Sequence, residues 1–238
     1  MKRIIASIAI IIVLVLPVVA SASMWTIDPD HTNIGFKVRH LMVSNVNGNF
    51  GKHIGTVNID DKDITKSKVE ITIDTTSINT NVQKRDEHLR GADFFDVAKY
   101  LTMTFVSKKV VKAGKDKLKV TGDLTMHGVT KEVVLDVVGL SKESKTPWGD
   151  IRKGFTASTK INRKDFGLVW NKALETGGVM IGDAVIITLD VEMVKTPTPK
   201  PPTATPVPQA APAAPAPPFQ AQPKVEQPKP EHPTEHPK

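Results

Sequence analysis

The sequence predicts an all-β fold: an eight-stranded antiparallel barrel with a short helical insertion near residues 81–98. Several segments alternate apolar and polar residues, which is typical of strands with one buried face. Glycine, asparagine and aspartate separate these segments at short intervals. The chain contains no cysteine, so packing and not disulfides must hold the fold. Antiparallel strands with one apolar face either form a sandwich or close, and closure removes exposed edges.

Four segments carry the clearest alternation. In the first, the residues that share one side are Ile34, Phe36, Val38, His40 and Met42. The same period of two recurs over residues 69–74, 118–126 and 185–193, where valine, isoleucine, leucine and methionine alternate with charged residues and threonine. Each segment is therefore predicted to be a strand that is apolar on one side and solvated on the other.

Turn signals lie between the strand segments. His127-Gly128 stands between two alternating runs, where a two-residue hairpin loop fits. We expect further turns at residues 47–49, 113–116 and 177–178, which are rich in glycine, asparagine and aspartate.

Residues 81–98 interrupt the strand pattern. We expect a short helix that begins near Thr80 or Asn81 as its cap and ends at Gly91. The arginine, aspartate and histidine at positions 85, 86 and 88 suggest an acid–base group. On a helix, however, positions 86 and 88 diverge. The favoured interpretation is that Arg85 and Asp86 form ion pairs and caps that fix the helix beside one end of the barrel.

Both ends of the chain differ from the central region. Residues 1–22 combine a basic start, an apolar run and a small-residue cleavage pattern, which predicts a secretory signal peptide or, if it is retained, an anchor. Residues 196–238 contain 15 of the 18 prolines and few large apolar side chains, which predicts a disordered tail with polyproline II character. Residues 23–195 remain as a single domain.

Composition and motifs exclude several functional classes. The net charge of +7 is scattered along the chain, so no nucleic-acid interface is predicted. The histidines show no zinc-type spacing, and residues 60–63 lack the glycine and glutamate that a calcium loop requires. The chain has no cysteine and no G-x-S-x-G elbow, so no catalytic residue, metal or required cofactor is predicted.

Two features leave alternatives open. Six lysines flank the turn at residues 113–116, which indicates either a solvated hairpin or a contact with an anionic membrane surface. His40 shares a face with apolar residues and should point inward, where a buried imidazole needs a hydrogen-bond partner. That partner is either another inward polar group or the polar end of a bound ligand.

Four segments in order resemble the YceI-like family. They read WTIDPDHTNIGFKVRHLMVSNVNGNFGKHIG (25–55), RDEHLRGADFFDVAKYLTMTF (85–105), GDLTMHGVTKEV (122–133) and INRKDFG (161–167). The resemblance covers about residues 25–194 and implies a lipocalin-like barrel in a periplasmic or secreted bacterial protein. It also implies that the interior holds a polyisoprenoid or an isoprenoid quinone and carries no catalytic residues.

Because the resemblance assigns no ligand contacts, strand parity and the aromatic pair after the helix supply them. The candidate ligand-binding residues are Phe36, Val38, His40, Met42, Ile71, Phe94, Phe95, Leu124, Met126, Ile187 and Leu189. The inward residues are mostly aliphatic, which favours a lumen with room for one slender ligand. The pair Phe94 and Phe95 fits either the end of the core or a gate against the ligand.

The prediction is a barrel that sequesters or transports an isoprenoid-like amphiphile. Two other classes stay open. One is a periplasmic lipid-modifying enzyme in which His40 or His88 acts as the base, and the other is a filled barrel whose proline-rich tail binds a partner. A homodimer is also compatible with the sequence.

Overall fold

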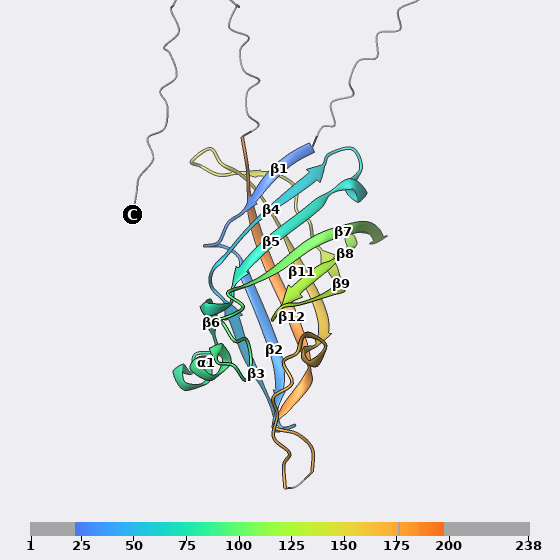
Figure 1. Ribbon diagram of the computed structural model, residues 1–238. Helices are drawn as coiled ribbons and strands as arrows, with labels where there is room; N and C mark the ends of the chain where they lie inside the picture. Colours follow the sequence, from blue (N-terminus) through green and yellow to red (C-terminus); the bar gives the residue numbers. More distant parts are fainter. Residues whose placement is uncertain (1–21, 176, 198–238) are drawn as a thin grey trace, which may run out of the picture. The chain divides into compact units, whose positions relative to one another are not determined.

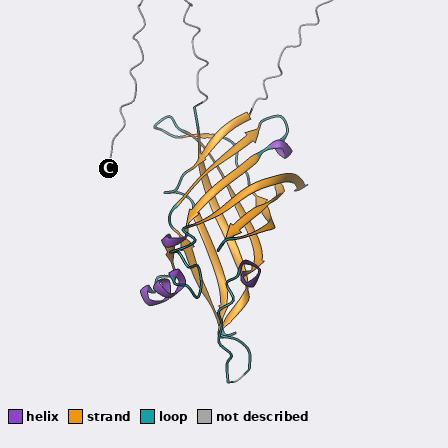
Figure 2. Cartoon of the chain, viewed as in Figure 1, coloured by secondary structure: helices purple, strands orange, loops and turns teal. Residues whose placement is uncertain are grey.

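Strands dominate the computed structural model, which describes residues 22–175 and 177–197. The strands are β1 (Ala22–Ile27), β2 (Asn33–His40), β3 (Ser44–Phe50), β4 (His53–Asp60), β5 (Lys68–Asp74), β6 (Ile78–Asn79), β7 (Thr102–Gly114), β8 (Lys117–Met126), β9 (Val129–Val138), β10 (Ser144–Lys145), β11 (Ile151–Asn162) and β12 (Ile181–Lys195). The helices are α1 (Gln83–Arg90) and the 3-10 turns η1 (Ile64–Lys66), η2 (Thr75–Ser77) and η3 (Arg163–Phe166). Figure 2 shows α1 to one side of the strands.

Eight strands form a closed antiparallel ring in the order β11-β9-β8-β7-β5-β4-β1-β12 (Figure 1). The ring closes where β11 pairs with β12, in a register that runs from Arg152 opposite Val194 to Asn162 opposite Ala184. The predicted all-β barrel of eight strands is therefore confirmed.

The wall made by the first part of the chain is interrupted. β12 pairs with β1 through residues 193–195 and with β2 through residues 181–190. β1 and β2 therefore lie end to end along the same edge of β12. β3 pairs with β2, and β4 pairs with β1. The β2–β3 hairpin thus extends beyond the closed ring, and its outer edge is covered only by the two residues of β6.

The alternation in β12 produces the barrel core. Val191 and Met193 are buried, whereas Asp190 and Thr188 on the opposite parity are exposed. The buried apolar residues group into three adjoining clusters along the barrel. Partly buried side chains such as Ile71 and Leu189 pack against all three, which joins the clusters into one interior.

The predicted hairpin loops are mostly present. β8 and β9 are joined by His127 and Gly128, whose φ angles of 52° and 74° suit a tight two-residue turn. The β7–β8 turn lies at residues 115–116, the second half of the predicted 113–116 turn, and residues 177–178 lie in the loop before β12.

One predicted turn is wrong. Residues 47–49 lie inside β3, and the hairpin turns instead at residues 41–43. A Cβ atom on Gly48 would lie 2.4 Å from the ring of Phe36, so this glycine makes room for an aromatic ring on the neighbouring strand. The glycine therefore serves packing and not a change of direction.

The helical insertion is shorter than the predicted range. α1 spans Gln83–Arg90 and is followed by turns, and Gly91 is its C-terminal cap as expected. The N-terminal cap is Val82, which makes no side-chain capping bond. Thr80 or Asn81 was expected as the cap, but neither takes that position, and the Thr80 hydroxyl instead donates to Asp86.

The two terminal predictions fall almost wholly outside the described residues. Of the proposed signal peptide, only Ala22 is described, and it belongs to β1. Of the proposed tail, only Thr196 and Pro197 are described. Within residues 22–175 and 177–197, no helix has the length and apolar character needed to cross a bilayer.

Candidate functional site: an apolar cavity in the barrel

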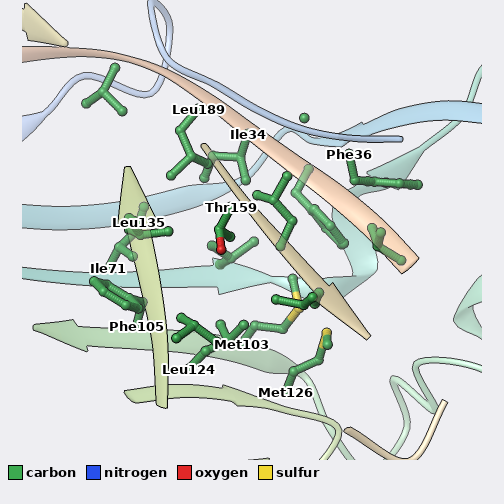
Figure 3. Close-up of a pocket in the computed structure, with 18 of the residues that line it drawn as sticks. Ile34, Phe36, Ile71, Met103, Phe105, Leu124, Met126, Leu135, Thr159 and Leu189 are labelled. Atoms are coloured by element: carbon green, nitrogen blue, oxygen red, sulfur yellow. The ribbon is translucent and has the colours of Figure 1, made fainter. Parts of the chain in front are cut away.

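The barrel interior contains a cavity of about 360 Å³. Its walls come from the inward faces of the ring strands, together with β2, α1 and the segment that follows η3. Figure 3 shows Ile71, Phe105 and Leu124 on one side of the space and Ile34 and Leu189 on the other. The lining is almost entirely aliphatic and aromatic, so the cavity suits an apolar molecule.

The structure brings nearly all candidate ligand-binding residues together. Those that line the cavity are Phe36, Val38, His40, Ile71, Phe94, Phe95, Leu124, Met126, Ile187 and Leu189. Met42 is the exception, because β2 ends at His40 and Met42 lies in the following turn with a φ of 58° and 42% exposure. The alternating pattern was extended one step too far at this end of the strand.

Strand parity also reveals lining residues that the sequence reading did not select. β7 and β11, which supplied none of the candidates, contribute Met103, Phe105, Thr159 and Ile161, among others. Both strands alternate in the sequence, but lysines and threonines interrupt their apolar pattern. The side chain of Thr159 is drawn in the middle of Figure 3, where its hydroxyl provides a polar point within apolar walls.

Polar lining residues gather mainly at one end of the cavity. Arg39 and His40 end β2, Arg85 and His88 come from α1, and Arg163 begins η3. Among all lining residues, Arg39 and His88 are the exposed ones. The cavity therefore reaches the surface between the end of β2 and α1, and this end is basic.

α1 is fixed to the barrel by its polar residues. The buried carboxylate of Asp86 accepts bonds from the Thr80 backbone N–H, at 2.9 Å, and the Thr80 hydroxyl, at 2.5 Å. Arg85 donates from Nε to the Thr80 hydroxyl and from Nη2 to the Thr80 carbonyl. Arg90 donates to the carbonyls of Thr76 and Ile78. These groups anchor the helix, as predicted for Arg85 and Asp86, although through hydrogen bonds to Thr80 and not through ion pairs.

An aromatic cluster joins α1 to the segment after η3. The ring of His88 packs edge-on against Phe94, with centroids 5.0 Å apart, and against Trp170, at 5.1 Å. Phe94 and Trp170 are themselves 5.3 Å apart. His88 Nε2 lies 2.8 Å from a carboxylate oxygen of Asp93, which orients the ring. All three residues of the cluster line the cavity.

Arg163, at the start of η3, is a buried cation that also lines the cavity. Its guanidinium donates to the carbonyls of Gly182, at 3.0 Å, and Leu168. Burial lowers the pKa of Arg163 from its usual value, while nearby Asp183 acts in the opposite direction. The bonds to backbone carbonyls hold the 163–168 segment against the start of β12.

Several polar groups at this end make hydrogen bonds that hold α1 and the 163–168 segment in place. Within the described ranges, no histidine hydrogen-bonds to a serine or threonine hydroxyl, which is the pairing that would activate a nucleophile. Away from the cavity, Asp28, His31 and Glu192 lie close enough to suggest a metal site. The guanidinium of Arg152 pairs with both carboxylates there, at 2.6 Å from Asp28, and offsets part of their charge.

Comparison with known proteins gives a consistent answer. Residues 25–193 match the YceI-like domain. A UPF0312 protein of Vibrio parahaemolyticus is 41% identical over 172 residues, which is 71% of this chain and 89% of the relative. The Campylobacter jejuni YceI protein superimposes with a TM-score of 0.57 and 36% identity, covering 71% of this chain and 96% of that protein. A polyisoprenoid binding domain from Saccharophagus degradans shares the fold, with a TM-score of 0.53, 18% identity and coverage of 72% and 98%.

Proposed function

We propose that this chain, which belongs to the YceI-like family, binds a long apolar amphiphile inside its barrel and sequesters or carries it in the cell envelope. A polyisoprenoid or an isoprenoid quinone fits this description. The signal-peptide pattern of residues 1–22 supports a periplasmic or secreted location. The proposed role is carriage and not catalysis, and it requires no cofactor.

The observation that carries this proposal is the cavity itself. A volume of about 360 Å³ lies within the range of small-molecule binding sites and is lined along its length by apolar side chains. A barrel whose interior is filled by its own side chains has no room for a ligand. The branched, methyl-rich chain of a polyisoprenoid matches walls made of isoleucine, leucine, valine and methionine. The similarity to a polyisoprenoid binding domain adds support at the level of the fold.

The energetics assign different roles to the two ends of the ligand. Each buried methylene group contributes about 0.8 kcal/mol, so several isoprene units outweigh a head-group hydrogen bond of about 1–3 kcal/mol. The net affinity is smaller than this sum because association and ordering have costs. The chain of the ligand therefore provides the affinity. His40, together with Arg85 and His88 at the basic end, determines which way the head group faces.

The test is to identify the co-purified lipid. Protein purified from its native host should release an isoprenoid-type lipid on organic extraction, detected by mass spectrometry at close to one molecule per barrel. Extraction from a heat-unfolded sample of the same preparation is the control for surface-bound lipid. Repeated preparations that yield no such lipid would overturn the proposal.

A further inference from the structure

The turn between β2 and β3 exposes three large apolar residues in a row. Leu41, Met42 and Val43 retain 39%, 42% and 77% of their surface. Isolated apolar residues on a surface need no explanation, but a contiguous group at the tip of a hairpin marks a contact site. All three side chains are exposed, so packing of the core does not explain why they are apolar.

The backbone of this turn is unfavourable for the residues that it contains. Leu41 and Met42 have φ angles of 50° and 58°, and the Val43 N–H donates to the His40 carbonyl, at 3.0 Å. Two successive left-handed residues suit Asn-Gly and are poorly suited to leucine and methionine. The sequence thus keeps apolar side chains where a hairpin alone would favour small polar ones, which points to a role outside folding.

The tip borders the opening of the cavity. The Leu41 N–H donates to the Met180 carbonyl, at 2.7 Å, and Met180 lines the cavity together with Arg39 and His40. Arg39 is also one of the two exposed lining residues. A ligand that passes through this opening therefore leaves the barrel beside the exposed apolar turn.

The charges around the tip are mainly positive. Arg39 donates to the Met42 carbonyl, at 2.9 Å, which places its guanidinium beside the apolar side chains. Lys172 is exposed, and its carbonyl accepts from the Met180 N–H. Lys37 lies two residues before Arg39, and Glu175 is the acidic residue of the adjacent loop. Cations that flank an apolar tip match the interface of a bilayer with anionic head groups.

The lysine-rich β7–β8 hairpin is a weaker candidate for membrane contact. Lys108 pairs with Asp123 and Glu132, both at 3.0 Å, and Lys119 pairs with Asp136, at 2.6 Å. These acidic partners offset part of the positive charge on that surface. The exposed apolar turn and the opening of the cavity lie together at the end of β2 instead.

We propose that residues 41–43, with Arg39, dock the opening of the cavity onto the surface of an anionic phospholipid bilayer. The three apolar side chains enter the head-group layer, and Arg39 contacts lipid phosphates. This orientation gives a lipid an apolar route between the bilayer and the barrel. The purpose of the docking rests on the proposed lipid carriage, but the docking itself depends only on the turn and its charges.

The test uses the full chain and two kinds of vesicle, one of phosphatidylcholine and one of phosphatidylcholine with an equal amount of phosphatidylglycerol. Wild-type protein should co-sediment with the mixed vesicles. The double variant Leu41→Asn, Met42→Gly should lower the partition coefficient by roughly tenfold or more, since two large side chains leave the interface. Its melting temperature should stay the same or rise, because Asn-Gly suits the turn. Arg39→Gln should weaken binding to the mixed vesicles more than to phosphatidylcholine.

Two controls separate this site from others. Ile54→Asn removes a side chain that is 73% exposed on β4, and Trp148→Ser removes one that is 85% exposed near β10. Both should leave vesicle binding within about twofold of wild type. No binding by wild-type protein, undiminished binding by the double variant, or an equal loss in Trp148→Ser would overturn the proposed docking. Lipid extraction is scored separately: vesicle binding by a barrel that carries no lipid would refute carriage and leave docking intact.

Discussion

Thr80 and Asp86 form the contact that fixes the helical insertion, because one buried carboxylate oxygen of Asp86 accepts from both the N–H and the hydroxyl of Thr80. Asp86 is only 6% exposed and Thr80 only 4%. The helix has no side-chain cap at its N-terminus, so this contact performs the task of a cap from inside the first turn. The insertion is therefore held by polar groups and not only by its apolar side chains.

Asp86→Ala should lower the free energy of unfolding by about 2–3 kcal/mol, because it leaves two buried donors of Thr80 without an acceptor. Urea denaturation measures the loss. Glu87→Ala, at an exposed position one residue further on, should change stability by no more than about 0.5 kcal/mol. Equal effects of the two substitutions would show that the contact with Thr80 contributes little.

Filling the cavity tests whether the lumen is the binding site. Val133 lines the cavity, and its neighbour Val134 is exposed on the outside of the same strand. Val133→Trp should weaken the binding of a fluorescent isoprenoid probe at least about tenfold by occupying the space, whereas Val134→Trp should leave it within about twofold. Comparable melting temperatures for the two variants are required for the comparison. Unchanged affinity in Val133→Trp would place the ligand elsewhere.

The cluster of His88, Phe94 and Trp170 should control how quickly the ligand leaves. Trp170→Ala removes the ring that both others touch, and we expect the dissociation rate constant of the probe to rise about tenfold, equivalent to about 1.4 kcal/mol of lost packing. Stopped-flow release into excess unlabelled lipid measures this rate. Trp148→Ala, which truncates an exposed tryptophan, is the matched control. A rate that does not change in Trp170→Ala would remove the cluster from the exit route.

The buried imidazole of His53 should make the free energy of unfolding depend on pH. Its ring is 5% exposed and neither nitrogen has a hydrogen-bond partner from another side chain, and burial lowers its pKa below the ordinary value. Because the unfolded chain then binds the proton first, the free energy of unfolding should fall as pH drops below about 6.5 and level off below the folded-state pKa. The slope from this group is at most about 1.4 kcal/mol per pH unit.

Urea denaturation at about pH 7.5 and about pH 5.5 measures the change in stability. His53→Leu should reduce the loss on acidification, while His31→Gln, at an exposed histidine, should retain it. If His53→Leu loses as much stability on acidification as wild type does, the pH dependence comes from other groups.

The faces of the strands could be predicted because side chains alternate with a period of two. Phe36, Leu124 and Leu189 were selected on parity alone, and all three line the cavity. The register of one strand against another cannot be obtained in this way. β1 pairs with β4 and β2 pairs with β3, while both β1 and β2 lie beside β12. This arrangement is decided by long-range pairing and not by the alternation within any one strand.

The errors came from residues whose local preference is overridden by their neighbours. Asn47, Gly48 and Asn49 have the composition of a turn but lie in a strand, because the ring of Phe36 occupies the space above Gly48. Leu41 and Met42 have no turn preference and yet form the turn. Local residue preferences therefore predicted the turn at the wrong place. The error lies next to the proposed membrane contact, and a conflict between sequence and conformation is expected at a functional site.

The last prediction concerns the proline-rich segment. The described residues that line the cavity lie between Ile27 and Met193, and Thr196 completes the sheet edge by donating its N–H to the Met24 carbonyl, at 2.8 Å. A chain that ends after Pro197 keeps these contacts, so it should bind the isoprenoid probe with an affinity within about twofold of the full chain and melt at the same temperature. Calorimetry and probe titration of the two forms measure both quantities. A large loss of affinity in the shortened chain would make the tail part of the binding site, and a lost cellular function with unchanged affinity would assign the tail a partner of its own.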